Sequence, residues 1–311
     1  MSLLHLAIAQ NCEIEMVKHL VTLGADVNKE ANWDMTPLYA AAGWNSSVEV
    51  LKYLISEGAN IHAEHVHYGT PLHCAAAHNP NVEVLDYLVS IGADIRKKIE
   101  GMTLLHFAAE SNRTVDVLKY LVSQGLDVNT KDDYEKSPLY FAASGNSNVE
   151  VLKYLVSQCV DVNVKNRNNN TPLHAIVTYG RNIDFLRYLV SQCADVNAKN
   201  QWGNTPLHQN CIWVAKVEIV QSLISFGAKI NAKNDNGATP LHLASARSHV
   251  KVAILECLVS LGADVGVKDD EGRTPLDVAS SEEKKACLRK AMEQAKKVRW
   301  DNETPFCMGA G

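Results

Sequence analysis

One tripeptide recurs along the whole chain at a nearly constant spacing. Thr-Pro-Leu, or a close variant of it, begins at residues 2, 36, 70, 103, 137, 171, 205, 239 and 274, so successive copies lie 33 to 35 residues apart. Nine copies at one period indicate a stack of small structural units, none of which can bury its apolar face alone. This repeat overrides the two-domain expectation that a length of 311 residues would otherwise suggest.

Each unit predicts two helices joined by a turn. In residues 137–170, Ser137 can cap a helix and Pro138 suits its first position, where no backbone N–H is needed. A second helix is expected from about Val149 to Ser157, because its apolar residues recur on one stripe at helical spacing.

Glycine ends the second helix in most units, where a left-handed backbone conformation is wanted. These glycines are Gly24, Gly58, Gly92, Gly125, Gly227 and Gly262. Two adjacent units carry Cys159 and Cys193 instead, at a cost of roughly 1 kcal/mol each relative to glycine. We interpret both cysteines as tolerated small replacements, with a redox role as the alternative.

These motifs resemble the ankyrin repeat family. The units at Thr171, Thr205 and Thr239 begin Thr-Pro-Leu-His, residues 24–28 read Gly-Ala-Asp-Val-Asn, and the resemblance covers residues 2 to about 280. It implies an all-α solenoid, a curved stack of helix-turn-helix repeats with projecting β-hairpin loops. The motif departs from the family pattern where Tyr39 and Tyr140 replace histidine and where Asp34, Tyr68, Glu135 and Asn169 replace the loop glycine.

The predicted organisation is therefore nine repeats over residues 1–280, followed by a capping helix and a tail. Residues 281–299 are acidic at their start and basic toward their end, as the helix dipole favours, and they carry few apolar contacts. Residues 300–311 are expected to form a flexible tail.

Composition excludes several other classes of protein. With 46% hydrophobic and 21% charged residues, the chain is too apolar to be disordered, and no run is long enough for a membrane span. The first residues show no signal-peptide pattern, and the eight cysteines are scattered singly. We therefore expect a cytoplasmic protein that is not associated with membranes.

No catalytic constellation stands out in the sequence. We find no glycine-rich phosphate loop, no His-Glu-x-x-His motif and no nucleophile elbow. We therefore predict a protein that is not an enzyme and that needs no cofactor. Six histidines recur at the motif position, which favours a structural hydrogen-bonding role: His5, His73, His106, His174, His208 and His242.

A second group of histidines surrounds the loop that leads into the third unit. His62, His65, His67 and His78 crowd this loop and the following helix. His65, His67 and His78 are the candidates for a metal site, because imidazole is a common zinc ligand. A pH-dependent contact patch and ordinary solvated loop residues are the alternatives.

Aromatic residues gather where the resemblance places the concave groove. At the hairpin tips and at the ends of the first helices we find Trp33, Trp44, Tyr134, Tyr179, Trp202 and Trp213. Exposed aromatic side chains are the usual anchors of a protein interface, although local Trp–Trp packing would also explain them. His67, His78, Arg167 and Arg247 complete the predicted partner-binding set.

Charge is unevenly distributed along the chain. Residues 1–130 hold 8 Lys and Arg against 15 Asp and Glu, whereas residues 160–255 hold 10 against 5. Lys131, Lys165, Lys199 and Lys233 form a column at one repeat position. This asymmetry would orient a protein partner whose acidic segment faces repeats 6–8. Nucleic acid is a poor fit, because the net charge is −5 and no nucleic-acid motif is present.

Asparagines follow valine in the loop turns of several units. We expect them to hydrogen-bond to their own turn backbone. The family resemblance further implies that such asparagines can be hydroxylated, and the candidates are Asn129, Asn163, Asn197 and Asn231.

Together these features predict a monomeric, non-catalytic adaptor or scaffold that captures another protein in the concave groove. Two alternatives stay open. The chain could be a secreted effector of a bacterium or parasite that targets a host protein, or a metal- or pH-responsive binding protein that uses the cluster between His62 and His78.

Overall fold

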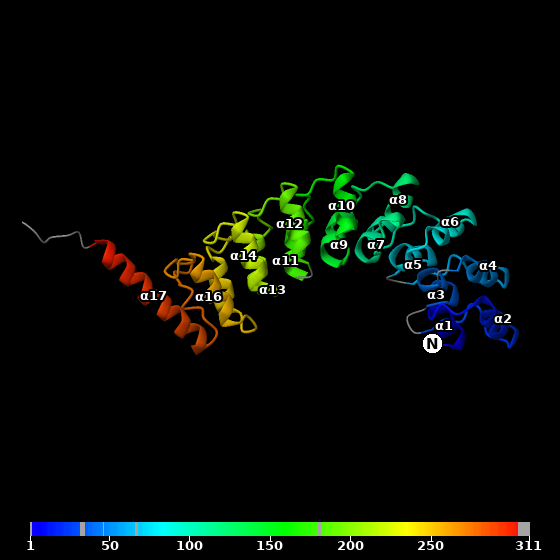
Figure 1. Ribbon diagram of the computed structural model, residues 1–311, viewed down its shortest axis with the longest axis horizontal. Coiled ribbons are helices and arrows are strands. Elements are labelled where there is room, and N and C mark those ends of the chain that lie inside the picture. The colour runs from blue at the N-terminus through cyan, green and yellow to red at the C-terminus, as the bar shows by residue number, and fades with distance from the viewer. Residues whose placement is uncertain (1, 32–34, 46, 66–67, 180–181, 304–311) are drawn as a thin grey trace, which may run out of the picture. The chain divides into compact units, whose positions relative to one another are not determined.

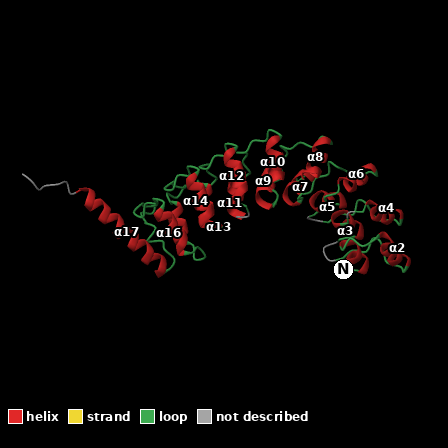
Figure 2. Ribbon diagram, in the orientation of Figure 1, coloured by secondary structure: helices red, strands yellow, loops and turns green. Residues whose placement is uncertain are grey.

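The computed structural model describes residues 2–31, 35–45, 47–65, 68–179 and 182–303, with side chains as far as residue 295. Helices joined by loops make up this part of the chain (Figure 2). It divides into two compact units, Met1–Arg167 and Asn168–Gly311, and we describe each by itself.

The N-terminal unit contains ten helices in its described residues. They are α1 (Leu3–Ala9), α2 (Ile14–Thr22), α3 (Pro37–Trp44), α4 (Val48–Ser56), α5 (Pro71–His78), α6 (Val82–Ser90), α7 (Leu104–Ser111), α8 (Val115–Ser123), α9 (Pro138–Gly145) and α10 (Val149–Ser157). The odd-numbered helices contact one another in sequence order, and so do the even-numbered ones, which gives two rows (Figure 1). Each helix pair begins where the repeated tripeptide predicts it.

The C-terminal unit continues the pattern with three helix pairs and one longer helix. They are α11 (Pro172–Tyr179), α12 (Ile183–Ser191), α13 (Pro206–Trp213), α14 (Val217–Ser225), α15 (Pro240–Ala246), α16 (Val252–Ser260) and α17 (Glu282–Glu303). The first helices α11, α13 and α15 contact one another in turn, and α17 packs against α16.

The first helix of each pair is buried almost all round, whereas the second buries one face. In α5 every residue from Pro71 to Ala77 is buried, while α6 buries Val84, Leu85 and Leu88. Small side chains allow this close packing, because a Cβ atom added to Gly43 on α3 would lie 2.3 Å from the Cys74 sulfur on α5. The first helices of the repeats therefore form the core of each of the two compact units.

The motif histidines form hydrogen bonds through both ring nitrogens, one within their own repeat and one to the next repeat, in line with the structural role that their repeated placement predicts. In His106, Nδ1 accepts from the backbone N–H of Thr103 at 3.0 Å, and Nε2 donates to the carbonyl of Lys136 at 3.1 Å. Burial lowers the pKa of His73, His106 and His208 to about 4, so these rings are uncharged at neutral pH.

Buried asparagines at the ends of the first helices form a second link between units. Asn79 donates from Nδ2 to the carbonyls of Ala42 and Asn45, at 2.8 and 2.9 Å, in the preceding unit. Asn112 and Asn146 repeat these bonds one and two units later. The ladder satisfies carbonyls that a helix end would otherwise leave without donors.

The projecting loops are tight turns rather than extended β-hairpins. Within the described residues only two isolated antiparallel bridges occur, His65–Gly69 and Ile99–Met102. In one such loop, the backbone N–H of Asn200 donates a hydrogen bond to the Asn204 carbonyl at 3.0 Å and closes the turn. The Asn200 side chain accepts from the N–H groups of Trp202 and Asn204, so little backbone is left for a strand ladder.

Residues in the left-handed backbone conformation lie at the ends of the second helices, where the sequence predicts them. Cys159 and Cys193 have φ values of 60° and 66°, in the slot that Gly125 occupies with φ 79° in an earlier unit. Both cysteines are exposed and carry the strain that a side chain brings to this conformation.

The C-terminal end differs from the prediction in two ways. Residues 275–278 form a turn instead of a first helix, with the Asp277 carboxylate accepting from the Thr274 N–H at 2.8 Å. Helix α17 ends at Glu303, so the tail predicted for 300–311 is wrong for residues 300–303, and 304–311 lie outside the described residues. No glycine or proline interrupts the helix before Pro305, which explains its length.

Candidate functional site

The last residue of the first helix projects from the core in several units. Trp44, Tyr179 and Trp213 occupy this position and are 41%, 50% and 61% exposed. The next residue turns the chain away, as where the buried Asn45 donates from Nδ2 to the Ile8 carbonyl at 3.3 Å. In the repeats where a buried asparagine follows the first helix (Asn45, Asn79, Asn112 and Asn146), the last helical residue therefore lies beside a fixed point of the backbone.

In the N-terminal unit, two of the predicted site residues stack on each other. The Trp44 indole and the His78 imidazole lie 5.5 Å apart between ring centroids, with an angle of 17° between their planes. Tyr39 lies 6.4 Å from both Trp44 and His65, and the His65 and Tyr68 rings are 4.7 Å apart.

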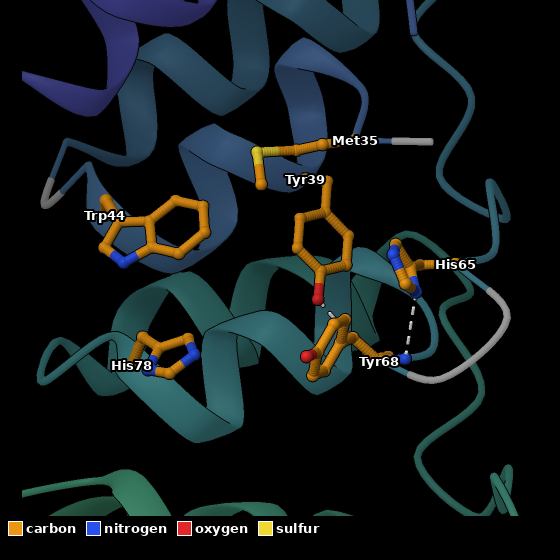
Figure 3. A pocket seen from close by; sticks show the side chains of 6 residues that line it. All are labelled: Met35, Tyr39, Trp44, His65, Tyr68 and His78. Carbon is orange, nitrogen blue, oxygen red and sulfur yellow. Dashed lines mark hydrogen bonds between the residues drawn. The ribbon is translucent and has the colours of Figure 1, made fainter. Parts of the chain in front are cut away.

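Together with Met35, these five rings line a pocket of about 330 Å³ (Figure 3). Tyr39 is buried on α3, while Tyr68, which is 58% exposed, reaches the pocket from the loop before α5. The pocket therefore opens to solvent beside a rigid pair of first helices.

The polar groups of this pocket are largely satisfied from within. The Tyr39 hydroxyl donates to the Tyr68 carbonyl at 3.4 Å, and the Tyr68 N–H donates to Nδ1 of His65 at 3.2 Å. Desolvation beside the Trp44 ring lowers the pKa of His78, which keeps its imidazole uncharged at neutral pH. The pocket walls therefore consist of aromatic rings and the Met35 thioether.

A second group of predicted site residues meets at the loop before α9. The Arg167 guanidinium carbon lies 5.8 Å from the centroid of the Tyr134 ring, and Arg167 N–H donates to the Tyr134 carbonyl at 3.0 Å. The Lys136 ammonium nitrogen also lies over this ring, 5.4 Å from the Tyr134 centroid. Tyr134 remains 55% exposed.

The C-terminal unit exposes its predicted aromatic residues singly. Trp202 is 49% exposed on a loop, and among the described residues no ring contact joins it to Trp213. Arg247, the cap residue after α15, is exposed, and its carbonyl accepts from the Lys284 ammonium.

Two predicted residues, Trp33 and His67, lie outside the described residues. Of the metal candidates, His65 is buried and His78 exposed, and both line the same pocket. The described part of the chain contains no group of three His, Cys, Asp or Glu side chains suited to a metal ion.

Lysines of the column donate hydrogen bonds to backbone carbonyls of the next repeat. Lys199 Nζ donates to the Lys233 carbonyl, and Lys233 Nζ to the Lys268 carbonyl, each at 2.8 Å. In the N-terminal unit Lys131 reaches the Lys165 carbonyl at 3.3 Å. These exposed lysine side chains therefore link neighbouring loops.

The loop asparagines Asn28, Asn197 and Asn231 bridge to the next repeat, contrary to the expectation that they bond to their own turn. Asn197 donates from Nδ2 to the Gly227 carbonyl at 3.0 Å and accepts from the Lys229 N–H at 2.8 Å. The preceding aspartate serves the local turn, since Asp195 accepts from the Asn197 N–H. Asn231 bridges in the same way to Gly262 and Asp264.

Comparison with protein families agrees with this geometry. A family model described as ankyrin repeats, three copies, matches residues 4–99, 76–166, 139–234 and 210–299. The chain belongs to the ankyrin repeat family. Ankyrin repeats are generally protein–protein interaction modules, and proteins built from them are typically not enzymes.

A further comparison finds no curated protein that matches this ankyrin repeat chain. Of the helices in its described residues, none combines the length and apolar character that a membrane crossing requires.

Sequence reasoning missed three residues of the aromatic pocket: Met35, Tyr39 and Tyr68. Tyr39 and Tyr68 were visible as departures from the ankyrin motif, at the histidine and loop-glycine positions of the repeat that spans residues 36–69. Two aromatic departures from the motif within one repeat were the signal that could have predicted this pocket.

Proposed function

We propose that this ankyrin repeat protein is a non-catalytic adaptor that captures a partner protein on the side chains at its loop tips and first-helix ends. The observation that carries the proposal is the exposure of Trp44, Tyr179, Trp202 and Trp213, which are 41–61% exposed on otherwise buried or tightly bonded backbone. Exposed aromatic residues on a rigid support are typical anchors of protein interfaces.

Rigidity supports this role. Buried asparagine and histidine ladders hold each first helix against its neighbour, so the anchors are fixed before the partner arrives. Little conformational entropy is then lost on association.

The partner surface facing repeats 6–8 is proposed to be acidic. Residues 160–255 carry a net charge of +5, with Lys199 and Lys233 exposed on successive loops. Such a field raises the association rate more than the affinity, and salt screens it. Binding should therefore weaken steadily as the salt concentration rises, and binding that does not change with salt would remove the charge argument.

The proposal is tested by removing two anchors together, with Trp202→Ala and Trp213→Ala in one variant. Both side chains are about half exposed, so the free energy of unfolding should change by less than about 1 kcal/mol. Capture of the partner from a lysate of the source cells should be lost. The matched control is Leu261→Ala, an exposed apolar residue at the end of α16, which should retain the partner.

Two results would contradict the adaptor proposal. A large loss of stability in the double variant would show that the tryptophans belong to the core. Unchanged capture by a stable double variant would show that these anchors do not bind the partner.

We also propose hydroxylation of the loop asparagines Asn129, Asn163, Asn197 and Asn231, which follows from the family alone. Mass spectrometry of the chain isolated from its own cells should show a gain of one oxygen atom on peptides that contain them, and peptides at the unmodified mass would contradict it.

A further inference from the structure

The aromatic pocket of the N-terminal unit has a chemistry that the adaptor proposal does not use. Its lining consists of the rings of Tyr39, Trp44, His65, Tyr68 and His78 and the thioether of Met35 (Figure 3). The tyrosine, tryptophan and methionine side chains carry no formal charge, and neither does a histidine side chain whose imidazole is neutral. The faces of aromatic rings are electron-rich and attract organic cations, most strongly at indole and phenol rings.

The pocket favours a cation that needs no hydrogen-bond acceptor. Two acceptors are already occupied, because the Tyr68 carbonyl accepts from the Tyr39 hydroxyl and Nδ1 of His65 accepts from the Tyr68 N–H. An unmodified ammonium group has three N–H donors to satisfy, and it would lose its water here for few acceptors. A methylated ammonium group has few or none and presents an apolar surface to the rings.

Charge around the pocket also fits a cationic segment. A neighbouring pocket of about 170 Å³ shares Tyr39, Tyr68 and His78 with the first one, and the Glu110 side chain lines it. Residues 1–130 carry a net charge of −7. Among the described residues that line the first pocket there is no Lys or Arg that could pair with a phosphate, which disfavours a phosphocholine headgroup.

Size and access fit a side chain rather than a large ligand. A volume of about 330 Å³ is at the lower end of the range for ligand pockets. Trp44 and Tyr68 are 41% and 58% exposed, so the pocket is open to a side chain whose backbone stays outside.

We propose that this pocket binds the methylated ammonium group of a lysine side chain on a partner protein. The proposal rests on the adaptor function and gives it a specific chemistry in the N-terminal unit. The aromatic rings surround the cation, and the acidic repeats attract the basic segment that carries it.

The test is a titration with the acetylated amide of trimethyllysine, followed through the indole N–H signal of Trp44 in nuclear magnetic resonance spectra. The Trp44→Leu variant identifies that signal by its loss. Three comparison probes are the same amide of unmodified lysine, its neutral carbon analogue with a tert-butyl end, and phosphocholine. We expect trimethyllysine to bind at least roughly tenfold more tightly than each of these.

Variants locate the site. Tyr68→Ala, followed through the Trp44 signal, should weaken trimethyllysine binding by roughly tenfold, and Tyr68 lies on a loop, where truncation spares the core. Trp44→Leu lacks that signal, so its binding is compared with that of the wild type by isothermal titration calorimetry and should be weaker by roughly tenfold as well. Trp213→Leu removes an indole from the same helix position in the other unit and should leave probe binding unchanged.

Three outcomes would overturn the proposal. If the neutral analogue binds as tightly as trimethyllysine, the pocket is apolar without selectivity for cations. If no probe binds, the rings form no binding site. Tighter binding of phosphocholine would assign the pocket to a lipid headgroup or free metabolite. These results are separate from the capture experiment, because the probe needs no partner and the Trp202 and Trp213 anchors lie in the other unit.

Discussion

Acid should destabilise this protein through motif histidines that must stay uncharged to keep their bonds. In His106, Nδ1 accepts from the Thr103 N–H and Nε2 donates to the Lys136 carbonyl, so a proton on Nδ1 would remove an acceptor. The ring is fully buried, and this burial lowers its pKa to about 4. A histidine in an unfolded chain has a pKa near 6.5.

The direction and size of the effect follow from these two values. Between about pH 6.5 and about pH 4 the unfolded chain binds more protons than the folded chain, so the free energy of unfolding falls as the pH falls. From about pH 7 to about pH 5.5 one such histidine removes about 1.2 kcal/mol. His73 and His208, whose pKa values are also lowered to about 4, add similar amounts.

The assay is urea denaturation followed by circular dichroism, at both pH values, for the wild type and for His106→Gln. Glutamine offers an acceptor and a donor but does not titrate. The variant should therefore lose about 1.2 kcal/mol less than the wild type over this pH interval. Any packing defect at residue 106 affects both pH values and cancels in the difference. Equal losses in the two proteins would refute the reasoning, because His106 would then bind protons alike in both states.

Three further predictions test packing, backbone strain and the C-terminal helix. Gly43→Ala should cost about 1–3 kcal/mol, since its new methyl group meets the Cys74 sulfur at 2.3 Å, and Cys74→Ala in the same chain should restore most of that loss in urea denaturation. Cys159→Gly should raise the free energy of unfolding by roughly 0.5–1 kcal/mol, because φ is 60° there. The Lys284 ammonium donates to the Ala244 carbonyl at 3.0 Å, so Lys284→Met should lower the free energy of opening of α17 by about 2 kcal/mol and speed amide hydrogen exchange along this helix.

The Gly43 reasoning fails if the double variant is no more stable than Gly43→Ala alone. A less stable Cys159→Gly would mean that strain at this position is smaller than the entropy that glycine adds to the unfolded chain. For α17 the control is Lys285→Met, whose exposed ion pair with Glu282 contributes little, and equal exchange in the two lysine variants would contradict the prediction.

Much of the fold could be predicted from the sequence because each repeat encodes its structure locally. Pro138 and the residues from Val149 to Ser157 lie in helices with the predicted starts and ends. The left-handed positions at Cys159 and Cys193 were predictable in the same way, since one residue's backbone conformation ends the helix. These features depend on neighbours within a few residues.

Contacts between repeats were only partly predictable. The motif histidines recur, which correctly indicated a structural role, but their carbonyl partners lie about 30 residues away. The loop asparagines were assigned to their own turn, whereas Asn197 bonds across to the next repeat. A turn and a bridge to a neighbour use the same residue type, so composition does not distinguish them.

Period, caps and apolar stripes act over short distances along the chain, so the repeat, the helices and the family follow from the sequence alone. Which exposed side chains meet depends on the folded chain. Tyr39 and Tyr68 join Trp44 in one pocket, whereas among the described residues no ring contact joins Trp202 to Trp213. The physical reason is that such contacts depend on how a loop side chain from one repeat is directed toward the helix of the next, and periodicity carries no information about that direction.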